Sequence, residues 1–320
     1  MNIKNQSRSR AQKRNMIFYC CILAVPIVQF LIFYLFINIK TVLLTFQEYD
    51  YGTISGRSPG YYFAGLKNLQ EFFRMFAEGK DMYALRYSVT NSLWMAIVSF
   101  LISAPLSIMF SFYIYKKKFM ASAFKMLLFM PSVISSIVIC VIFLYVAEDA
   151  IPTLINQLFN RTDTMGLLSS SHYGVRQATL VFFSSWVGFG GAVLIYSGAM
   201  NGINDSVLEA AQIDGAKEFR QLVSVVFPMI FPTFTTLIVS TIAGIFVNQY
   251  NLFSFYSSGN DVPYEIYTMG YFLYRKTQGA GNTFAEYPII ATMGFCISLI
   301  IAPLSLLIHR LLKKCGYNDQ

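Results

Sequence analysis

The chain has 320 residues, of which 55% are hydrophobic and only 12% are charged. Soluble domains carry about 25% charged residues, so this composition excludes an ordinary soluble domain and indicates a protein that folds in lipid. The net charge of +8 would suit a nucleic-acid partner, but the placement of the charges along the chain indicates orientation in a membrane instead.

Six apolar runs are long enough to cross a bilayer, which takes about 20 predominantly apolar residues. The first follows a basic stretch, but it is too long for a cleavable signal and no small-residue cleavage site follows it, so we expect an uncleaved first span. The sequence has no visible repeat or low-complexity linker, and we therefore predict an all-α membrane protein with a single transmembrane domain over residues 1–320. The runs are 16–39, 88–115, 126–147, 178–200, 233–255 and 288–309.

The charges outside these runs predict the orientation of the chain. With six spans, both termini and the loops 116–125 and 201–232 lie on one side. That side carries 14 of the 24 Lys and Arg and 5 of the 16 Asp and Glu, a net charge of +9 against −1 on the other side. Cytoplasmic loops are enriched in Lys and Arg, so we predict a cytoplasmic basic tail over 1–15 and cytoplasmic termini.

Every Asp, Glu, Lys and Arg lies outside the six apolar runs. A charge at the centre of a span costs roughly 2.5–3.5 kcal/mol on insertion scales, and those that occur usually mark ion or proton pathways. Because the spans offer no proton relay, energy for uphill transport would enter from outside them.

The five cysteines indicate neither a metal site nor a disulfide framework. Four lie in apolar runs and the fifth in the C-terminal tail, without metal-ligand or redox spacing. They are Cys20, Cys21, Cys140, Cys296 and Cys315.

The segment 40–87 on the external side predicts an amphipathic helix. Apolar residues recur there at helical spacing with charged residues between them, which suits a helix on the outer membrane interface or one packed on other helices. The apolar positions are Leu66, Leu69, Phe72, Phe73 and Phe76.

The cytoplasmic segment 201–232 predicts a short helix, a tight turn and a second helix. Ser206 and Glu209 have the spacing of a capping box, so the first helix should begin near Val207. Gly215 can adopt the left-handed conformation that ends a helix. A second helical stretch then follows, and two prolines, Pro228 and Pro232, break or kink the chain where it re-enters the membrane.

This loop resembles the EAA motif of ABC importer permeases, in which the loop forms a coupling helix that docks on a separate ATP-binding subunit. The spacing from the first Glu through the Gly to the Pro is met in full. The resemblance implies that the coupling residues are Glu209, Ala210, Ala211, Asp214, Gly215 and Ala216, with Pro228 closing the motif.

Shorter motifs resemble the carbohydrate branch of that family, the maltose and multiple-sugar permeases of the bacterial plasma membrane. They are Gly65-Leu66-Lys67-Asn68, Asn91-Ser92-Leu93, Phe129-Met130-Pro131 and the Trp186, Gly188 and Gly190 set. Two segments depart from the pattern. Asn204 replaces a usual Pro, and Ser258-Gly259-Asn260 replaces a frequent Gly-Gly-Pro.

The chain contains no Gly-x-x-x-x-Gly-Lys-Ser/Thr phosphate loop, so we expect it to be no enzyme and to bind no cofactor itself. The resemblance implies ATP and Mg on partner ATPase subunits, a second homologous permease subunit and an external solute-binding protein that delivers a sugar or oligosaccharide. We expect no nucleic-acid partner.

Sugars are recognised by hydroxyls, amides and aromatic faces in pockets with few charges. Thr241, Gly244, Asn248 and Asn251 follow steps of three, four and three, which predicts one helical face. These polar groups, like the serines and glycines of the other spans, suit helix–helix contacts as well. The resemblance to maltose-type permeases implies a substrate path lined by Ser132, Ser136, Gly188, Gly191, Thr241 and Asn248, to which the face adds Gly244.

Three other functions remain open on the sequence. The chain could be an ABC permease for a non-sugar solute such as a polyamine, a phosphate or a metal chelate. It could be an ATP-independent secondary transporter or channel, which would place ionisable residues in the spans. It could also be a membrane-anchored assembly protein with no pathway.

Overall fold

The computed structural model describes residues 3–52, 58–79, 81–256, 262–278 and 284–315. The chain divides into two compact units, and the described residues of both are mostly helical. The first unit comprises Met1–Arg74 and Gly279–Cys296, and the second comprises Met75–Gln278 and Ile297–Gln320. The departing motif Ser258-Gly259-Asn260 lies outside the described residues.

The first unit begins with a long apolar helix and continues into a small β-hairpin that the sequence did not predict. The helix comprises α1 (Ile3–Gln29), the π-helical turn η1 (Phe30–Phe36) and α2 (Ile37–Thr45). Strands β1 (Gln47–Asp50) and β2 (Gly60–Phe63) pair antiparallel, with Gln47 opposite Phe63. The unit also contains most of α3 (Lys67–Ala77) and the start of α14 (Tyr287–Cys315).

The predicted amphipathic helix is confirmed as α3. Phe72 on one side of it is buried, whereas the neighbouring Phe73 is exposed. The motif residue Asn68 is also buried, and its Nδ2 donates hydrogen bonds to the carbonyl oxygens of Thr45 at 2.9 Å and Gln47 at 2.7 Å. This amide therefore holds the start of α3 against the junction between α2 and β1.

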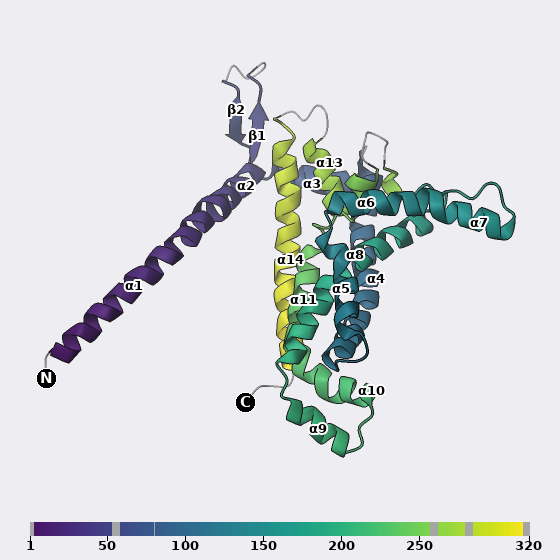
Figure 1. Ribbon diagram of the computed structural model, residues 1–320. Helices are drawn as coiled ribbons and strands as arrows, with labels where there is room; N and C mark the ends of the chain where they lie inside the picture. Colours follow the sequence, from purple (N-terminus) through teal and green to yellow (C-terminus); the bar gives the residue numbers. More distant parts are fainter. Residues whose placement is uncertain (1–2, 53–57, 80, 257–261, 279–283, 316–320) are drawn as a thin grey trace. The chain divides into compact units, whose positions relative to one another are not determined.

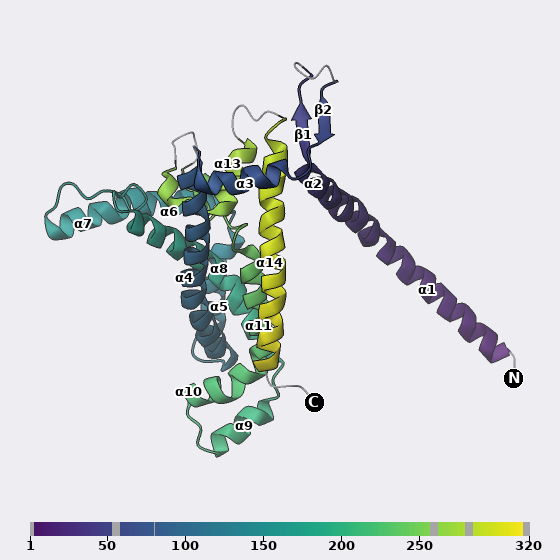
Figure 2. The ribbon, with the colours of Figure 1, turned by 180° about the vertical axis from the view of Figure 1, so that it is seen from behind.

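The second unit is a helical bundle. Figures 1 and 2 show α4, α5, α8 and α11 side by side, with α9 and α10 at one end of this bundle and α6 and α7 at the other. Its elements before the loop are α4 (Met82–Tyr115), α5 (Ala121–Val133), α6 (Ser136–Tyr145), η2 (Val146–Ala150), α7 (Ile151–Phe159) and α8 (Tyr173–Asn201). Those that follow are α9 (Asp205–Ile213), α10 (Glu218–Gln221), η3 (Leu222–Val226), α11 (Phe227–Gly244), α12 (Leu252–Phe255), η4 (Tyr264–Ile266), α13 (Met269–Gln278) and the remainder of α14.

Helices α4 and α8 run in the same direction and are joined by hydrogen bonds at three levels. Nε2 of Gln177 donates to Oδ1 of Asn91 at 2.8 Å. The Ser99 and Ser185 hydroxyls lie 2.8 Å apart, and the Ser111 hydroxyl donates to the Val193 carbonyl at 3.0 Å. Residue numbers rise together along both helices, which gives their common direction.

The motif residue Asn91 also anchors a segment distant in the sequence. Its Nδ2 donates to the carbonyl oxygens of Glu265 at 2.7 Å and Tyr267 at 2.9 Å, while the neighbouring Ser92 hydroxyl accepts from the Met269 amide at 2.8 Å. Asn91 and Ser92 are both buried. They therefore fix the start of α13 on α4.

Six helices among the described residues are long and apolar enough to cross a membrane. They are Asn15–Thr45, Met82–Tyr115, Ser136–Phe159, Tyr173–Asn201, Glu218–Gly244 and Tyr287–Lys314. This number agrees with the six predicted spans, but the third and the fifth were placed wrongly. The fifth, predicted as 233–255, is Glu218–Gly244.

The predicted third span, 126–147, is not one helix. Ile134 and Ser135 have extended ψ angles of 144° and 131°, so α5 ends at Val133 and a new helix starts at Ser136. Serine favours helix starts over helix interiors, which agrees with a new helix at this pair of serines, although Ser135 makes no side-chain cap hydrogen bond. The candidate span is therefore Ser136–Phe159, and α5 is a shorter apolar helix.

Candidate functional site

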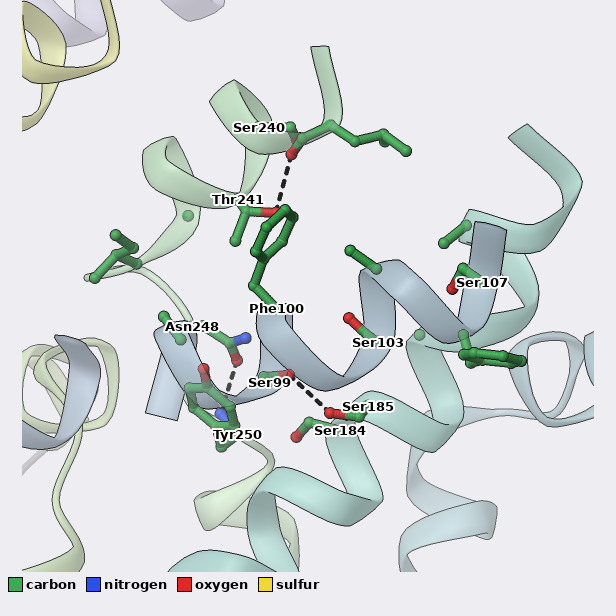
Figure 3. Close-up of a pocket in the computed structure, with 18 of the residues that line it drawn as sticks. Ser99, Phe100, Ser103, Ser107, Ser184, Ser185, Ser240, Thr241, Asn248 and Tyr250 are labelled. Atoms are coloured by element: carbon green, nitrogen blue, oxygen red, sulfur yellow. Dashed lines mark hydrogen bonds between the residues drawn. The ribbon is translucent and has the colours of Figure 1, made fainter. Parts of the chain in front are cut away.

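A cavity of about 480 Å³ opens within the second unit, between α4, α8 and the end of α11. Figure 3 shows hydroxyl and amide side chains from all three segments converging on it. None of the residues that line it is charged. They are Ala96, Ser99, Phe100, Ser103, Ala104, Ser107, Ser184, Ser185, Gly188, Phe189, Ala192, Tyr196, Leu237, Ser240, Thr241, Gly244, Ile245, Val247, Asn248 and Tyr250.

Four of the seven residues predicted for a substrate path line this cavity, namely Gly188, Thr241, Gly244 and Asn248. A Cβ at Gly188 would have no atom within 4 Å, so this glycine opens space. By contrast, a Cβ at Gly190 would lie 2.7 Å from the Cα of Phe129, so that glycine permits close packing of α8 on α5.

The other three predicted residues do not line this cavity. Ser132 and Ser136 lie on either side of the break between α5 and α6, and Gly191 lies on α8. The Ser132 hydroxyl donates to the Phe129 carbonyl of its own helix at 2.7 Å. Serines near a proline commonly bond the backbone in this way.

The single helical face expected for 241–251 is wrong, because α11 ends at Gly244. Asn248 reaches the cavity from the irregular segment that follows, where its Oδ1 accepts from the Tyr250 amide at 2.8 Å. Asn251 adopts a left-handed conformation with φ 55° and precedes α12. It does not line the cavity.

The serines of α4 and α8 that line the cavity were not predicted from the sequence. Ser99, Ser103 and Ser107 recur every four residues within one apolar run, and this spacing places them on one helical face. The spacing was available as a signal, but such stripes also serve helix packing, so only the structure connects them to the residues of α11.

The cavity offers hydrogen-bond donors and acceptors without charge. The Thr241 hydroxyl donates to the Leu237 carbonyl at 2.9 Å, which leaves its oxygen able to accept another hydrogen bond. Phe100, Phe189 and Tyr250 add aromatic surface. Such a lining suits an uncharged polyhydroxyl solute.

A second candidate site is the loop containing α9 and α10. The predicted capping box is wrong, because Asn204 caps α9 and its Oδ1 accepts from the Ser206 amide at 3.1 Å. Asparagine is as good a helix cap as serine, and here it stands one position before the helix begins at Asp205.

The turn after α9 agrees with the prediction. Gly215 has φ +76°, and the Ala216 amide donates to the Ala211 carbonyl at 2.9 Å. Glu209, Ala210 and Ala211 lie within α9, and Asp214 is its C-cap. Their role in docking a partner is not tested by this geometry and stays a prediction.

The loop packs on the bundle through one buried apolar residue, and hydrogen bonds and an ion pair add to this contact. Leu208 is buried in a cluster with residues of α4, α8 and η3. Nε2 of Gln221 donates to the Ala216 carbonyl at 2.6 Å, while its Oε1 accepts from Nζ of Lys116 at 2.6 Å. Lys118 forms an ion pair with Glu218.

The outer surface of the loop is exposed and carries two large apolar side chains. Ile213 is 87% exposed and Phe219 is 73% exposed. Two acidic residues close to Ile213 in the sequence, Glu209 and Asp214, are exposed as well.

Comparison with known proteins identifies a family and a fold. The profile of the family described as "Binding-protein-dependent transport system inner membrane component" matches residues 89–314. The arabinooligosaccharides transport system permease protein AraP of Bacillus subtilis (strain 168) is 26% identical over 287 residues, covering 88% of this chain and 84% of that protein.

A second relative is the probable starch degradation products transport system permease protein AmyD of Thermoanaerobacterium thermosulfurigenes. It is 26% identical over 191 residues, covering 60% of this chain and 61% of that protein. A similar solved structure is a bacterial alginate ABC transporter in complex with an alginate pentasaccharide-bound periplasmic protein. Its matching chain has a TM-score of 0.73 at 19% identity, covering 96% of this chain and 97% of that one, so the two share a fold.

Proposed function

Since the chain belongs to the family of binding-protein-dependent transport system inner membrane components, we propose that it is one transmembrane permease subunit of an ABC importer for a sugar or oligosaccharide. The observation that carries this proposal is the cavity of about 480 Å³ lined by hydroxyls, one amide and aromatic rings, without a charged residue. Ligand cavities typically measure about 300–1,000 Å³, so a sugar unit fits.

The lack of charge favours a sugar over the other solutes considered. A polyamine, a phosphate or a metal chelate is charged, and moving it into a low-dielectric cavity without an opposite charge is costly. The names of AraP and AmyD support the same substrate class.

A second permease subunit would complete the path. Thr241 and Asn248 are exposed on this chain although Thr241 lies within a candidate membrane-spanning helix and Asn248 follows its end. Polar groups facing lipid are costly, so they are best satisfied where another subunit covers them and encloses the cavity. The path would then open alternately to the two sides of the membrane.

The loop of α9 and α10 would receive the driving force from an ATPase subunit that binds ATP and Mg. Its exposed surface offers Glu209, Ala210, Ile213 and Asp214 to that partner, while Leu208 and Gln221 transmit movement to the bundle through buried contacts. The excess of Lys and Arg at this side supports a cytoplasmic loop with cytoplasmic termini.

Reconstituted transport tests the proposal. The chain is purified with its partner permease and ATPase, placed in proteoliposomes, and supplied with its external binding protein and with ATP on the α9 side. Suitable substrates are radiolabelled arabinotriose and maltotriose, with spermidine and phosphate as charged controls. We expect ATP-dependent and binding-protein-dependent uptake of a sugar. Uptake of a charged control alone, or sugar uptake by the chain without the ATPase, would refute the proposal.

A further inference from the structure

Along the contact between α4 and α8, one stretch of α4 makes no side-chain hydrogen bond to α8 among the described residues. The helices are bonded at Asn91, Ser99 and Ser111, but not at the two α4 serines between the last two positions, Ser103 and Ser107. Both of these serines line the cavity instead. On α8 the cavity is lined by Gly188, which has no side chain, and by Ala192, whose side chain is a single methyl group, so the space stays open.

Ser107 is a buried hydroxyl that has no hydrogen-bond partner among the described residues. Its relative exposure is 0%, and its Oγ is unpaired. The Oγ of Ser184, which lines the cavity at the level of the Ser99–Ser185 bond, is also buried and unpaired. Most buried hydroxyls are hydrogen-bonded, and these two unpaired ones lie at the wall of the cavity, where a hydroxyl of a ligand can supply the missing partner.

These hydroxyls lie at successive levels along the cavity. Figure 3 shows Ser99, Ser103 and Ser107 following one another along α4, with Asn248 and Tyr250 near Ser99 and away from Ser107. Ile108, which follows Ser107, belongs to the buried cluster that also contains Leu208 of α9. The row of serines therefore leads from the Asn248 end of the cavity toward the buried cluster on which the loop of α9 and α10 packs.

We propose that Ser103 and Ser107 form a second contact site for sugar hydroxyls, called here the inner binding step, which the substrate occupies after it leaves Asn248 and Thr241. This inference rests on the proposed function and assigns residues of α4 that the sequence did not suggest. Uncharged single hydroxyls suit such a step, because a transport path needs contacts strong enough to admit the solute and weak enough to release it.

Ser111 provides a matched control on the same helix. It is also fully buried and lies one turn beyond Ser107, but its hydroxyl is bonded to Val193 and it does not line the cavity. Ser107→Ala removes an unpaired hydroxyl, so the melting temperature of the assembled transporter should stay the same or rise. Ser111→Ala removes a paired hydroxyl and should lower it.

The effects of the two substitutions on uptake should be the reverse of their effects on melting temperature. The complete transporter in proteoliposomes, supplied with maltotriose or arabinotriose, should lose about 2- to 10-fold in maximal uptake per assembled complex with Ser107→Ala, the loss expected for one hydrogen bond. Ser111→Ala should keep uptake per complex near the wild-type value. If Ser107→Ala lowers the melting temperature and leaves uptake unchanged, the serine only packs helices and the inner step is wrong.

Cysteine labelling separates this inference from the proposed function. In a cysteine-free background, Ser103→Cys should react with 2-aminoethyl methanethiosulfonate, and the transported sugar should slow the reaction, whereas Ser111→Cys should not react. Reaction without protection, in a transporter that carries sugar, would overturn the inner step alone. Absence of sugar uptake by the wild-type complex would overturn the proposed function. If, in addition, neither sugar slowed the labelling of Ser103→Cys, the inner binding step would be wrong as well.

Discussion

Nζ of Lys116, just after the end of α4, lies 2.6 Å from Oε1 of Gln221 at the end of α10. The same glutamine donates through Nε2 to the Ala216 carbonyl in the turn after α9. One buried side chain therefore connects the proposed coupling loop to a helix that lines the cavity.

The first prediction concerns this connection. Gln221→Leu should keep the chain inserted but weaken coupling, because it removes both bonds and leaves the Lys116 ammonium without its acceptor. Hydrogen bonds to charged groups contribute about 1.5–3 kcal/mol, so a loss of that order in the stability of the loop is expected. Sugar transported per ATP hydrolysed should fall several-fold.

The neighbouring exposed Arg220 provides the control for this prediction. Arg220→Ala should leave the ratio of transport to hydrolysis close to that of the wild type. An unchanged ratio in Gln221→Leu would show that the Lys116–Gln221 contact carries no coupling.

The second prediction concerns the turn at Gly215, whose φ is +76°. Proline is restricted to φ near −65° and lacks the amide that here donates to Gln212. Gly215→Pro should therefore abolish co-purification of the ATPase or uncouple it. Gly215→Ala should be milder, with a strain of about 1–2 kcal/mol.

Glu209→Ala is the comparison variant for the turn, because Glu209 is exposed on α9 and its removal leaves the backbone intact. A moderate decrease in ATPase affinity is expected. Normal transport and normal ATPase binding in Gly215→Pro would contradict the assignment of this loop.

The third prediction concerns Asn248. Asn248→Leu removes an amide from the cavity and the bond between its Oδ1 and the Tyr250 amide. A neutral hydrogen bond contributes about 0.5–1.5 kcal/mol, and loss of one to the sugar together with this local bond should reduce uptake several-fold or more. Basal ATP hydrolysis and assembly should persist.

Asn251→Leu is a control for Asn248, since Asn251 follows it closely but lies outside the cavity. We expect it to lower the yield, because leucine is disfavoured in the left-handed conformation of this residue. Its uptake per assembled complex should stay near wild type. Equal uptake per complex in both variants would remove Asn248 from the substrate path.

The fourth prediction concerns orientation. Thr162 lies between α7 and α8, and Gln212 lies in α9 at the other end of the second unit; both are exposed. In a cysteine-free background, Thr162→Cys should react with an impermeant thiol reagent in intact cells, and Gln212→Cys only after permeabilisation. The reverse pattern would invert the proposed topology.

Local patterns in the sequence were enough to predict the class of fold and the shape of the loop. Apolar runs of sufficient length predict spanning helices because lipid forces the backbone to satisfy its own hydrogen bonds. The left-handed Gly215 was predictable for a similar reason, since a glycine between two helical patterns has few other roles. The amphipathic α3 followed from the spacing of its apolar residues.

Helix boundaries were less predictable where neighbouring residues allowed two solutions. Asn204 and Ser206 are both good caps, and the structure uses Asn204. The third apolar run is interrupted only by Pro131 and by three serines, Ser132, Ser135 and Ser136, so its division between α5 and α6 was not evident. These choices depend on which ends of helices pack against the rest of the bundle.

By itself, then, the sequence determined a six-span membrane protein with a helix–turn–helix loop, because length, polarity and glycine conformation are properties of short segments. Only the tertiary structure decided which polar residues share a cavity. It joined Ser103 and Ser107 of α4 to Thr241 and Asn248, and it left out Ser132, Ser136 and Gly191. Facing surfaces are set by the packing of helices distant in the chain, and one helical turn more or less at Gly244 changes which side chains point inward.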